Sequence, residues 1–137
     1  MNIVFFSARQ LHKEYFSKLA QELTKQYPQY STSILWHKSL WLTFTWLKHL
    51  FLSFNTNLNQ IINDHIKEKK NSNKGRLRNK NYWPVFRIFK SLEAHVLYAI
   101  YYAAIKQKNP QYMVIWNGLK FRQCIAVAAA KTQGINC

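Results

Sequence analysis

The first 36 residues alternate between two hydrophobic patterns, and this alternation restricts the fold more than any other feature. Residues 3–6 and Ser31–Trp36 are short runs typical of buried strands. Residues 10–27 between them carry an apolar residue at every fourth position, with two more apolar residues beside this column, which predicts a one-sided helix that Pro28 ends (Leu11, Tyr15, Leu19, Leu23 and Tyr27, with Phe16 and Ala20). Strand, helix and strand in this order predict parallel pairing through a right-handed crossover. We therefore expect an α/β fold.

The rest of the chain returns to this alternation after a long insertion. Residues 39–66 are rich in large apolar side chains at helical spacing, so we expect one or two inserted helices. Residues 67–80 carry seven basic side chains, which predicts a mobile basic loop and extends the insertion over about 38–80. We further predict a helix from about Pro84 to Lys108, a strand over 112–116 and a helix over 121–133.

These elements predict a Rossmann-like parallel sheet with helices on both faces. Residues 135–137 resemble the start of a further parallel strand. Three strands are few for such a sheet, which usually has about four to six. We therefore expect residues 1–137 to be a partial, truncated N-terminal domain; a complete small domain is the alternative.

The charge of the chain is strongly positive. Twenty Lys and Arg residues face five acidic ones, which gives a formal net charge of +15. Such a field attracts nucleic acid, anionic lipid headgroups, or phosphorylated and nucleotide-linked substrates. A basic surface without a specific partner is the alternative.

Three features favour a cytoplasmic location. Cys124 and Cys137 show neither a CxxC motif nor a disulfide framework, which fits a reducing compartment. The N-terminus has no basic segment before its short apolar run, unlike a signal peptide. Four polar or basic side chains interrupt the longest apolar stretch, residues 34–54, so no spanning helix is predicted (His37, Lys38, Lys48 and His49).

Two loops are candidates for a binding site. They follow predicted parallel strands at the carboxyl edge, where open α/β sheets bind ligands. In the second loop, a glycine, a helix N-terminus and two basic side chains suit an anionic group, although Asn-Gly is also a common tight turn. The candidate cleft residues are Ser7, Arg9, Asn117, Gly118, Lys120 and Arg122. We find no catalytic motif and no histidine spacing typical of a metal site, so neither a metal nor a cofactor is predicted.

Aromatic and basic residues also interleave in residues 36–54. This pattern suits a bilayer interface, but equally the packing of a core or the cover of a partner domain. Stacking on single-stranded nucleic acid is a third, less favoured use, because the spacing is helical. The candidate membrane or anion contacts are Trp41, Trp46, Lys48, Lys69, Lys70, Lys74, Arg76 and Arg78.

One segment resembles a known family. Residues 113–123 read Met-Val-Ile-Trp-Asn-Gly-Leu-Lys-Phe-Arg-Gln, and the alanine-rich residues 126–130 and Gly134-Ile135 follow. Together they resemble a segment of bacterial capsule polysaccharide biosynthesis proteins, and the opening Phe5-Phe6-Ser7 with His12 and Tyr15-Phe16 is similar to the start of that family. The two stretches cover about a third of the chain.

The resemblance implies the N-terminal fragment of a Kdo-transferase-like glycosyltransferase with GT-B architecture. It implies a CMP-sugar donor (CMP-Kdo-like) on a C-terminal nucleotide-sugar domain that lies outside this sequence. The expected acceptor is an anionic lipid or lipid-linked glycan at the inner membrane, with the capsule export machinery as a further partner and the fragment inactive alone. A non-catalytic basic module that binds membrane or nucleic acid is the alternative function, although nucleic acid is the less expected partner.

Overall fold

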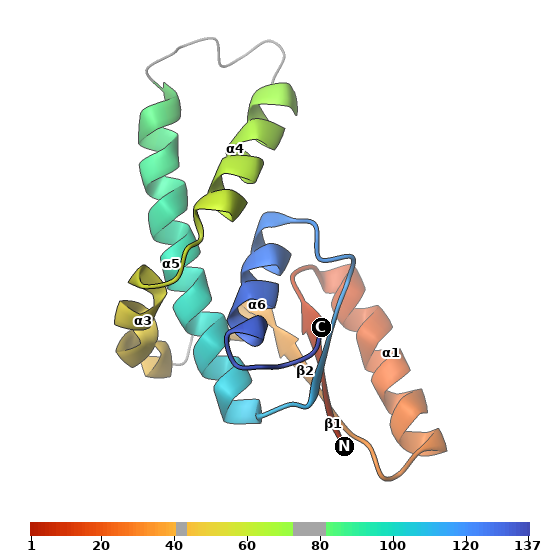
Figure 1. Ribbon diagram of the computed structural model, residues 1–137. Helices are drawn as coiled ribbons and strands as arrows, with labels where there is room; N and C mark the ends of the chain where they lie inside the picture. The colour runs from red at the N-terminus through yellow and green to blue at the C-terminus, as the bar shows by residue number, and fades with distance from the viewer. Residues whose placement is uncertain (41–43, 73–81) are drawn as a thin grey trace.

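The computed structural model describes residues 1–40, 44–72 and 82–137. Its centre is a three-stranded parallel sheet in which β1 (Asn2–Ser7) lies between β2 (Ser31–Trp36) and β3 (Tyr112–Ile115) (Figure 1). The helical elements are α1 (Gln10–Gln26), α2 (His37–Leu40), the short 3-10 helix η1 (Phe44–His49), α3 (Leu50–Phe54), α4 (Asn59–Ser72), α5 (Tyr82–Lys108) and α6 (Phe121–Lys131). The predicted α/β class, the parallel sheet and the three strands are confirmed.

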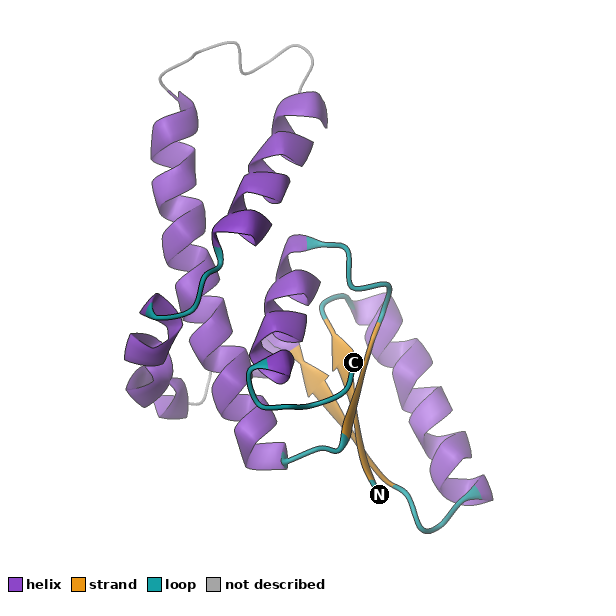
Figure 2. Ribbon diagram, in the orientation of Figure 1, coloured by secondary structure: helices purple, strands orange, loops and turns teal. Residues whose placement is uncertain are grey.

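Helices cover both faces of the sheet, as predicted (Figure 2). Side chains of β1 alternate between the faces because successive residues of a strand point to opposite sides. Phe5 packs against Phe16 of α1, with ring centres 5.2 Å apart. Phe6 points the other way and meets Tyr101 of α5 at 4.9 Å. The larger core, formed with α5 and α6, lies on that second face.

Only part of the predicted apolar stripe of α1 faces the sheet. Phe16 and Ala20 are its buried residues, whereas Leu11 and Tyr15 are 74% and 53% exposed. Two adjacent columns of apolar residues run along this helix, and the contact with Phe5 selects the column that contains Phe16. The predicted helix and its apolar stripe are confirmed, but periodicity alone does not tell which of two neighbouring columns within the stripe is buried.

The insertion contains more short elements than expected and its basic segment is partly helical. It comprises α2, η1, α3 and α4 before the chain reaches α5. Residues 67–72 belong to α4, so the predicted loop is wrong over that stretch; the rest of the predicted loop, 73–80, lies outside the described residues. Ile62 and Ile66 are buried one turn apart and hold α4 against the core, and Lys and Glu are good helix formers that continue it.

The long helix α5 changes character along its length. From Ala94 to Ile105 it is largely buried, between the sheet on one side and α6 on another. Ala126, Ala129 and Ala130 of α6 are fully buried beside it, and their small side chains let the two helices pack closely. The first part of α5 projects beyond the sheet together with α4 (Figure 1).

The C-terminal residues begin to extend the sheet. The amide of Met113 donates a hydrogen bond of 2.8 Å to the carbonyl of Asn136, and Asn136 forms a parallel bridge with Tyr112. This agrees with the expectation that residues 135–137 start a parallel strand beside β3. Among the described helices, none is long and apolar enough to cross a bilayer.

A buried polar pair connects the insertion to the core. The Nδ1 atom of His37, directly after β2, lies 2.7 Å from the Tyr101 hydroxyl oxygen. Burial lowers the pKa of His37 to about 4, and the nearby Arg122 acts in the same direction. Burial also raises the pKa of Tyr101. The neutral imidazole can therefore accept a hydrogen bond from the protonated hydroxyl.

The stability of the protein should fall as the pH is lowered from about 6.5 to about 4. The unfolded chain, in which His37 has an ordinary pKa near 6.5, binds more protons than the folded chain across this window. We expect the free energy of unfolding to drop by roughly 2 kcal/mol, given about 1.4 kcal/mol per pKa unit and partial screening. Urea denaturation at the two ends of the window measures the change.

The variant His37→Asn isolates the histidine from the other titrating groups. Its amide oxygen can still accept a hydrogen bond from Tyr101 but does not titrate. The drop in stability should therefore be smaller in the variant by about the contribution of His37. Equal drops in both proteins would contradict the assignment.

Candidate functional site

The connections of the sheet diverge between β1 and β3. The chain leaves β1 toward α1 on one face and leaves β3 toward α6 on the other, although the two strands are neighbours. Ligands of open α/β sheets bind beyond the carboxyl ends of the strands at such a switch point. A cleft of about 470 Å³ opens here, and its walls include Ala8 and Arg9 after β1 and Trp116 and Asn117 after β3.

The structure brings four of the six predicted cleft residues together. Arg9, Asn117, Lys120 and Arg122 all line this cleft, although 107 positions separate Arg9 from Trp116 in the sequence. Proximity of the two loops follows from the parallel pairing of β1 with β3, which places their carboxyl ends at the same edge. These four residues therefore lie in, or within two residues of, the two loops from which the site was predicted.

Ser7 and Gly118 have structural roles instead. Ser7 is fully buried, and its hydroxyl donates a hydrogen bond of 2.7 Å to the carbonyl of Arg9, which fixes the loop after β1. Gly118 has φ +61 and Asn117 has φ 49, so both take the left-handed conformation of a tight turn. The turn interpretation and the binding interpretation of Asn-Gly are thus compatible, because Asn117 also lines the cleft.

A third wall of the cleft comes from the helical insertion. His65, Glu68 and Lys69 of α4 and Lys90 and Glu93 of α5 line it. None of these residues was predicted to line the cleft, although Lys69 was among the candidate membrane or anion contacts. Each helix carries a basic and an acidic residue three positions apart, His65 with Glu68 and Lys90 with Glu93. The local sequence does not show which turn of a helix faces the sheet edge, so these pairs could not be assigned to the cleft.

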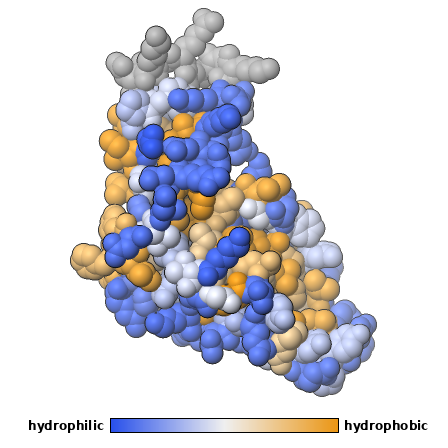
Figure 3. Space-filling view, in the orientation of Figure 1, coloured by the Kyte–Doolittle hydropathy of each residue, from blue (hydrophilic) through white to orange (hydrophobic). Residues whose placement is uncertain are grey.

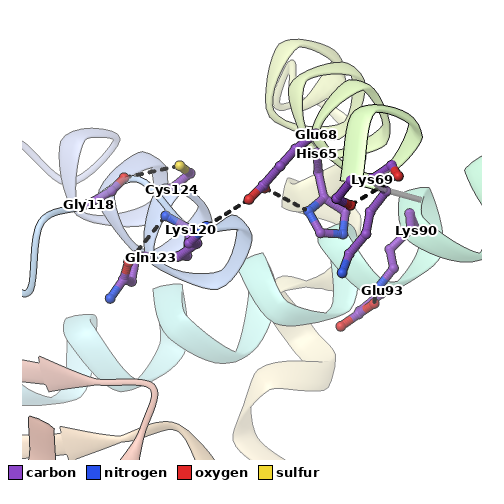
Figure 4. A network of polar contacts seen from close by, with 10 residues as sticks. His65, Glu68, Lys69, Lys90, Glu93, Gly118, Lys120, Gln123 and Cys124 are labelled. Carbon is purple, nitrogen blue, oxygen red and sulfur yellow. Dashed lines mark hydrogen bonds and ion pairs between the residues drawn. The ribbon is translucent and has the colours of Figure 1, made fainter. Parts of the chain in front are cut away.

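An ion pair joins this wall to the loop after β3. The Nζ atom of Lys120 lies 2.7 Å from a carboxylate oxygen of Glu68, across 52 positions of sequence (Figure 4). This contact lowers the pKa of Glu68, which stays ionised. On the α6 side, the side chain of Gln123 accepts a hydrogen bond of 3.2 Å from the Lys120 amide and caps the helix.

Positive charge dominates the cleft. Five cationic side chains line it against two carboxylates (Arg9, Lys69, Lys90, Lys120 and Arg122 against Glu68 and Glu93). Glu93 pairs with Lys90 and lies 3.9 Å from Arg122. Because Lys120 and Arg122 are 59% and 47% exposed, both reach the solvent-filled space. The cleft can therefore hold an anionic group, while its carboxylates can accept hydrogen bonds from hydroxyl groups.

Two histidines in the cleft are kept neutral by their surroundings. Burial lowers the pKa of His12, and the charge of Arg9 adds to the effect. Burial also lowers the pKa of His65, together with Lys90 and Lys69. A neutral imidazole can accept a proton or a hydrogen bond near neutral pH. The histidines therefore give the cleft acceptor groups besides its carboxylates.

An aromatic surface borders the cleft on the α1 side. The indole of Trp116 stacks on His12 with ring centres 4.8 Å apart, and the edge contact with Tyr15 is 5.4 Å. Trp116 remains 41% exposed. A ring held in place by such contacts and open on one side suits a ligand with an apolar face, such as a sugar ring.

The predicted membrane contacts are dispersed. Trp46 packs against the core with its indole nitrogen buried, whereas Lys48 is exposed on η1. Lys70 lies with Nζ 5.2 Å from the ring centre of Trp83, in a second basic hollow between α4 and α5. The other four candidates lie outside the described residues (Trp41, Lys74, Arg76 and Arg78).

The described residues contain no group of three or more His, Cys, Asp or Glu side chains arranged to hold a metal ion. Polar chemistry in the cleft rests on the cations, the two carboxylates and the two neutral imidazoles. These groups can bind an anion, orient hydroxyl groups and accept a proton.

Replacing Lys90 by Met should raise the pKa of His65 toward its ordinary value. The charge of Lys90 disfavours the imidazolium, so its removal weakens one of the causes of the lowered pKa. An NMR titration of the histidine rings measures the effect. Lys108→Met, at the far end of the same helix, removes the same charge and should leave the pKa of His65 unchanged. Equal shifts in both variants would show that net charge sets the pKa.

Comparison with known proteins identifies no relative of this chain. The chain matches no protein-family model, no curated protein and no solved structure. The likeness of residues 113–135 to capsule biosynthesis proteins therefore remains a hypothesis, and the functional argument rests on the cleft.

Proposed function

We propose that this chain binds an acidic saccharide at the carboxyl edge of its sheet, as the acceptor-side part of a capsule-type glycosyltransferase. The observation that carries the proposal is the cationic cleft at the switch point between β1 and β3. Substrate binding at this edge is a general property of open α/β sheets. The resemblance of residues 113–135 to capsule biosynthesis proteins supports the same interpretation.

The chemistry of the cleft favours an acidic sugar over a simple anion. Arg9, Lys120 and Arg122 can pair with a sugar carboxylate or a linking phosphate. Glu68 and His65 can accept hydrogen bonds from sugar hydroxyls. The exposed indole of Trp116 offers an apolar surface beside them. A small inorganic anion would use only the first of these three kinds of contact.

In this proposal the cleft holds the acceptor, a glycan with acidic sugars such as Kdo on a lipid carrier. The CMP-sugar donor belongs to the second domain expected in a complete GT-B enzyme. The isolated chain then binds acceptor without transferring sugar. The location that follows is the cytoplasmic face of the inner membrane, where the capsule export machinery takes over the product.

Removing two cations from the cleft should weaken binding of an acidic saccharide. We expect the double variant Lys120→Ala with Arg122→Ala to bind a Kdo disaccharide roughly tenfold more weakly, because each exposed ion pair contributes up to about 1 kcal/mol. Isothermal titration calorimetry measures the affinity. A neutral disaccharide on the same aglycone should bind weakly to both proteins.

The matched control is the double variant Lys106→Ala with Lys108→Ala. It removes the same charge from the last turn of α5, away from the cleft, and should bind the Kdo disaccharide normally. Equal losses in the two double variants would refute a specific site. Tight binding of single-stranded RNA or DNA at physiological salt, without binding of the disaccharide, would favour the alternative of a basic binding module.

A further inference from the structure

An apolar surface lies on the first part of α5, beside the cleft-facing side of the helix. The first part of this helix exposes large apolar side chains at helical spacing (Tyr82, Val85, Ile88, Phe89 and Leu92). Ile88 and Phe89 are 62% and 67% exposed. At 3.6 residues per turn these five positions share one side of the helix.

The same surface continues onto α3. Phe51 is 83% exposed and Phe54 is 56% exposed. Phe54 stacks on His95 of α5 with ring centres 4.8 Å apart, and His95 is one turn beyond Leu92. The hydrogen bond of 2.9 Å between His95 Nδ1 and the Ser53 carbonyl oxygen fixes this junction. The apolar residues of α3 and α5 therefore form one surface, which we name the outer apolar face.

The fold does not need this face for its own core. Trp83 and Phe86 of the same stretch of α5 pack against the core near α4, and Phe86 stacks on Tyr82 at the edge of the outer apolar face, with ring centres 5.5 Å apart. Lys90 and Glu93 also emerge away from the outer apolar face and line the cleft. The helix thus has one packed side, one side toward the cleft and one apolar side that no described residue covers. Figure 3 shows hydrophobic residues along the margin that α5 and α3 form.

The charge of the protein indicates which kind of partner binds the outer apolar face. Lys48, beside α3, is an exposed cation, and Arg87, Lys67 and Lys70 line the basic hollow between α4 and α5, on the Trp83 side of α5. The chain as a whole carries +15, so a second copy would meet it with like charge. An amphipathic helix with aromatic residues on its apolar side and cations around it is typical of proteins that lie in the interface of an anionic bilayer.

We propose that the outer apolar face inserts into the headgroup region of an anionic membrane. The inference deepens the proposed function and rests on it in one respect, since a lipid-linked acceptor requires the protein to work at a bilayer. Within the predicted segment 36–54 it assigns the membrane contact to Phe51 and Phe54, whereas Trp46 packs against the core, and it adds the exposed side of α5. The cleft then opens beside the membrane surface, because it lies on a neighbouring side of α5.

Vesicle sedimentation tests this proposal. The probes are anionic vesicles of about 30% phosphatidylglycerol in phosphatidylcholine and neutral vesicles of phosphatidylcholine alone. Comparing the two separates binding by charge from binding by insertion. We expect the wild type to bind the anionic vesicles, and Ile88→Asp with Phe89→Asp to lose on the order of tenfold or more in partition coefficient. Ile88→Ser with Phe89→Ser should lose binding without any change of charge.

The matched control is Leu11→Asp with Leu19→Asp, which adds the same two charges on exposed positions of α1. It should bind vesicles nearly as well as the wild type, and circular dichroism confirms that each variant is folded. Equal losses in the control, or unchanged binding in the serine variant, would overturn the proposal. A wild-type dimer that the α5 variants convert to monomer would assign the face to a second copy instead.

Failure of this proposal and failure of the proposed function give different results. The cleft variant Lys120→Ala with Arg122→Ala should still bind vesicles, and the α5 variants should still bind the Kdo disaccharide. Loss of saccharide binding with normal vesicle binding affects only the cleft assignment. If every variant with a lower net charge loses vesicle binding, general electrostatic attraction explains the binding. That result would overturn the role of the outer apolar face.

Discussion

The packing of α5 determines the rest of this structure. Its second part is buried between the sheet and α6, which fixes the direction of a helix that extends roughly 40 Å at 1.5 Å per residue. Its first part is therefore carried beyond the sheet in a defined orientation. The same helix places Lys90 and Glu93 at the cleft, packs Trp83 against the core near α4, and presents Phe89 to the outside. A change in the rotation of α5 would alter all three surfaces together.

The cleft combines a general feature of parallel sheets with a feature particular to this chain. Divergence of the connections after β1 and β3 leaves an open edge, as in other open α/β sheets. The insertion then closes one side of that edge, where Glu68 pairs with Lys120. Because this ion pair is exposed, it contributes little to stability. The ion pair instead holds the Lys120 ammonium group and the Glu68 carboxylate side by side in the wall of the cleft.

Much of the fold followed from local patterns, whereas the third wall of the site did not. Short apolar runs bounded by proline or glycine predicted the strands. The positions directly after parallel strands identified Arg9 and Lys120 as candidate cleft residues. The buried side of α1 depended on the contact between Phe5 and Phe16, which is a tertiary choice between two apolar columns. His65 and Glu93 are ordinary helix residues by sequence. Only the packing of α4 and α5 against the core turns them toward the sheet edge.

If the proposed function is correct, an acidic saccharide binds at the switch point between β1 and β3 and not elsewhere on the basic surface. The most direct test is a titration of the isotope-labelled chain with a Kdo disaccharide, followed by backbone amide NMR. The largest shift changes should fall in residues 8–12 and 116–123, around Arg9 and Lys120. Largest changes in the other basic hollow, around Lys67 and Arg87 between α4 and α5, or small changes spread over all basic segments, would contradict it.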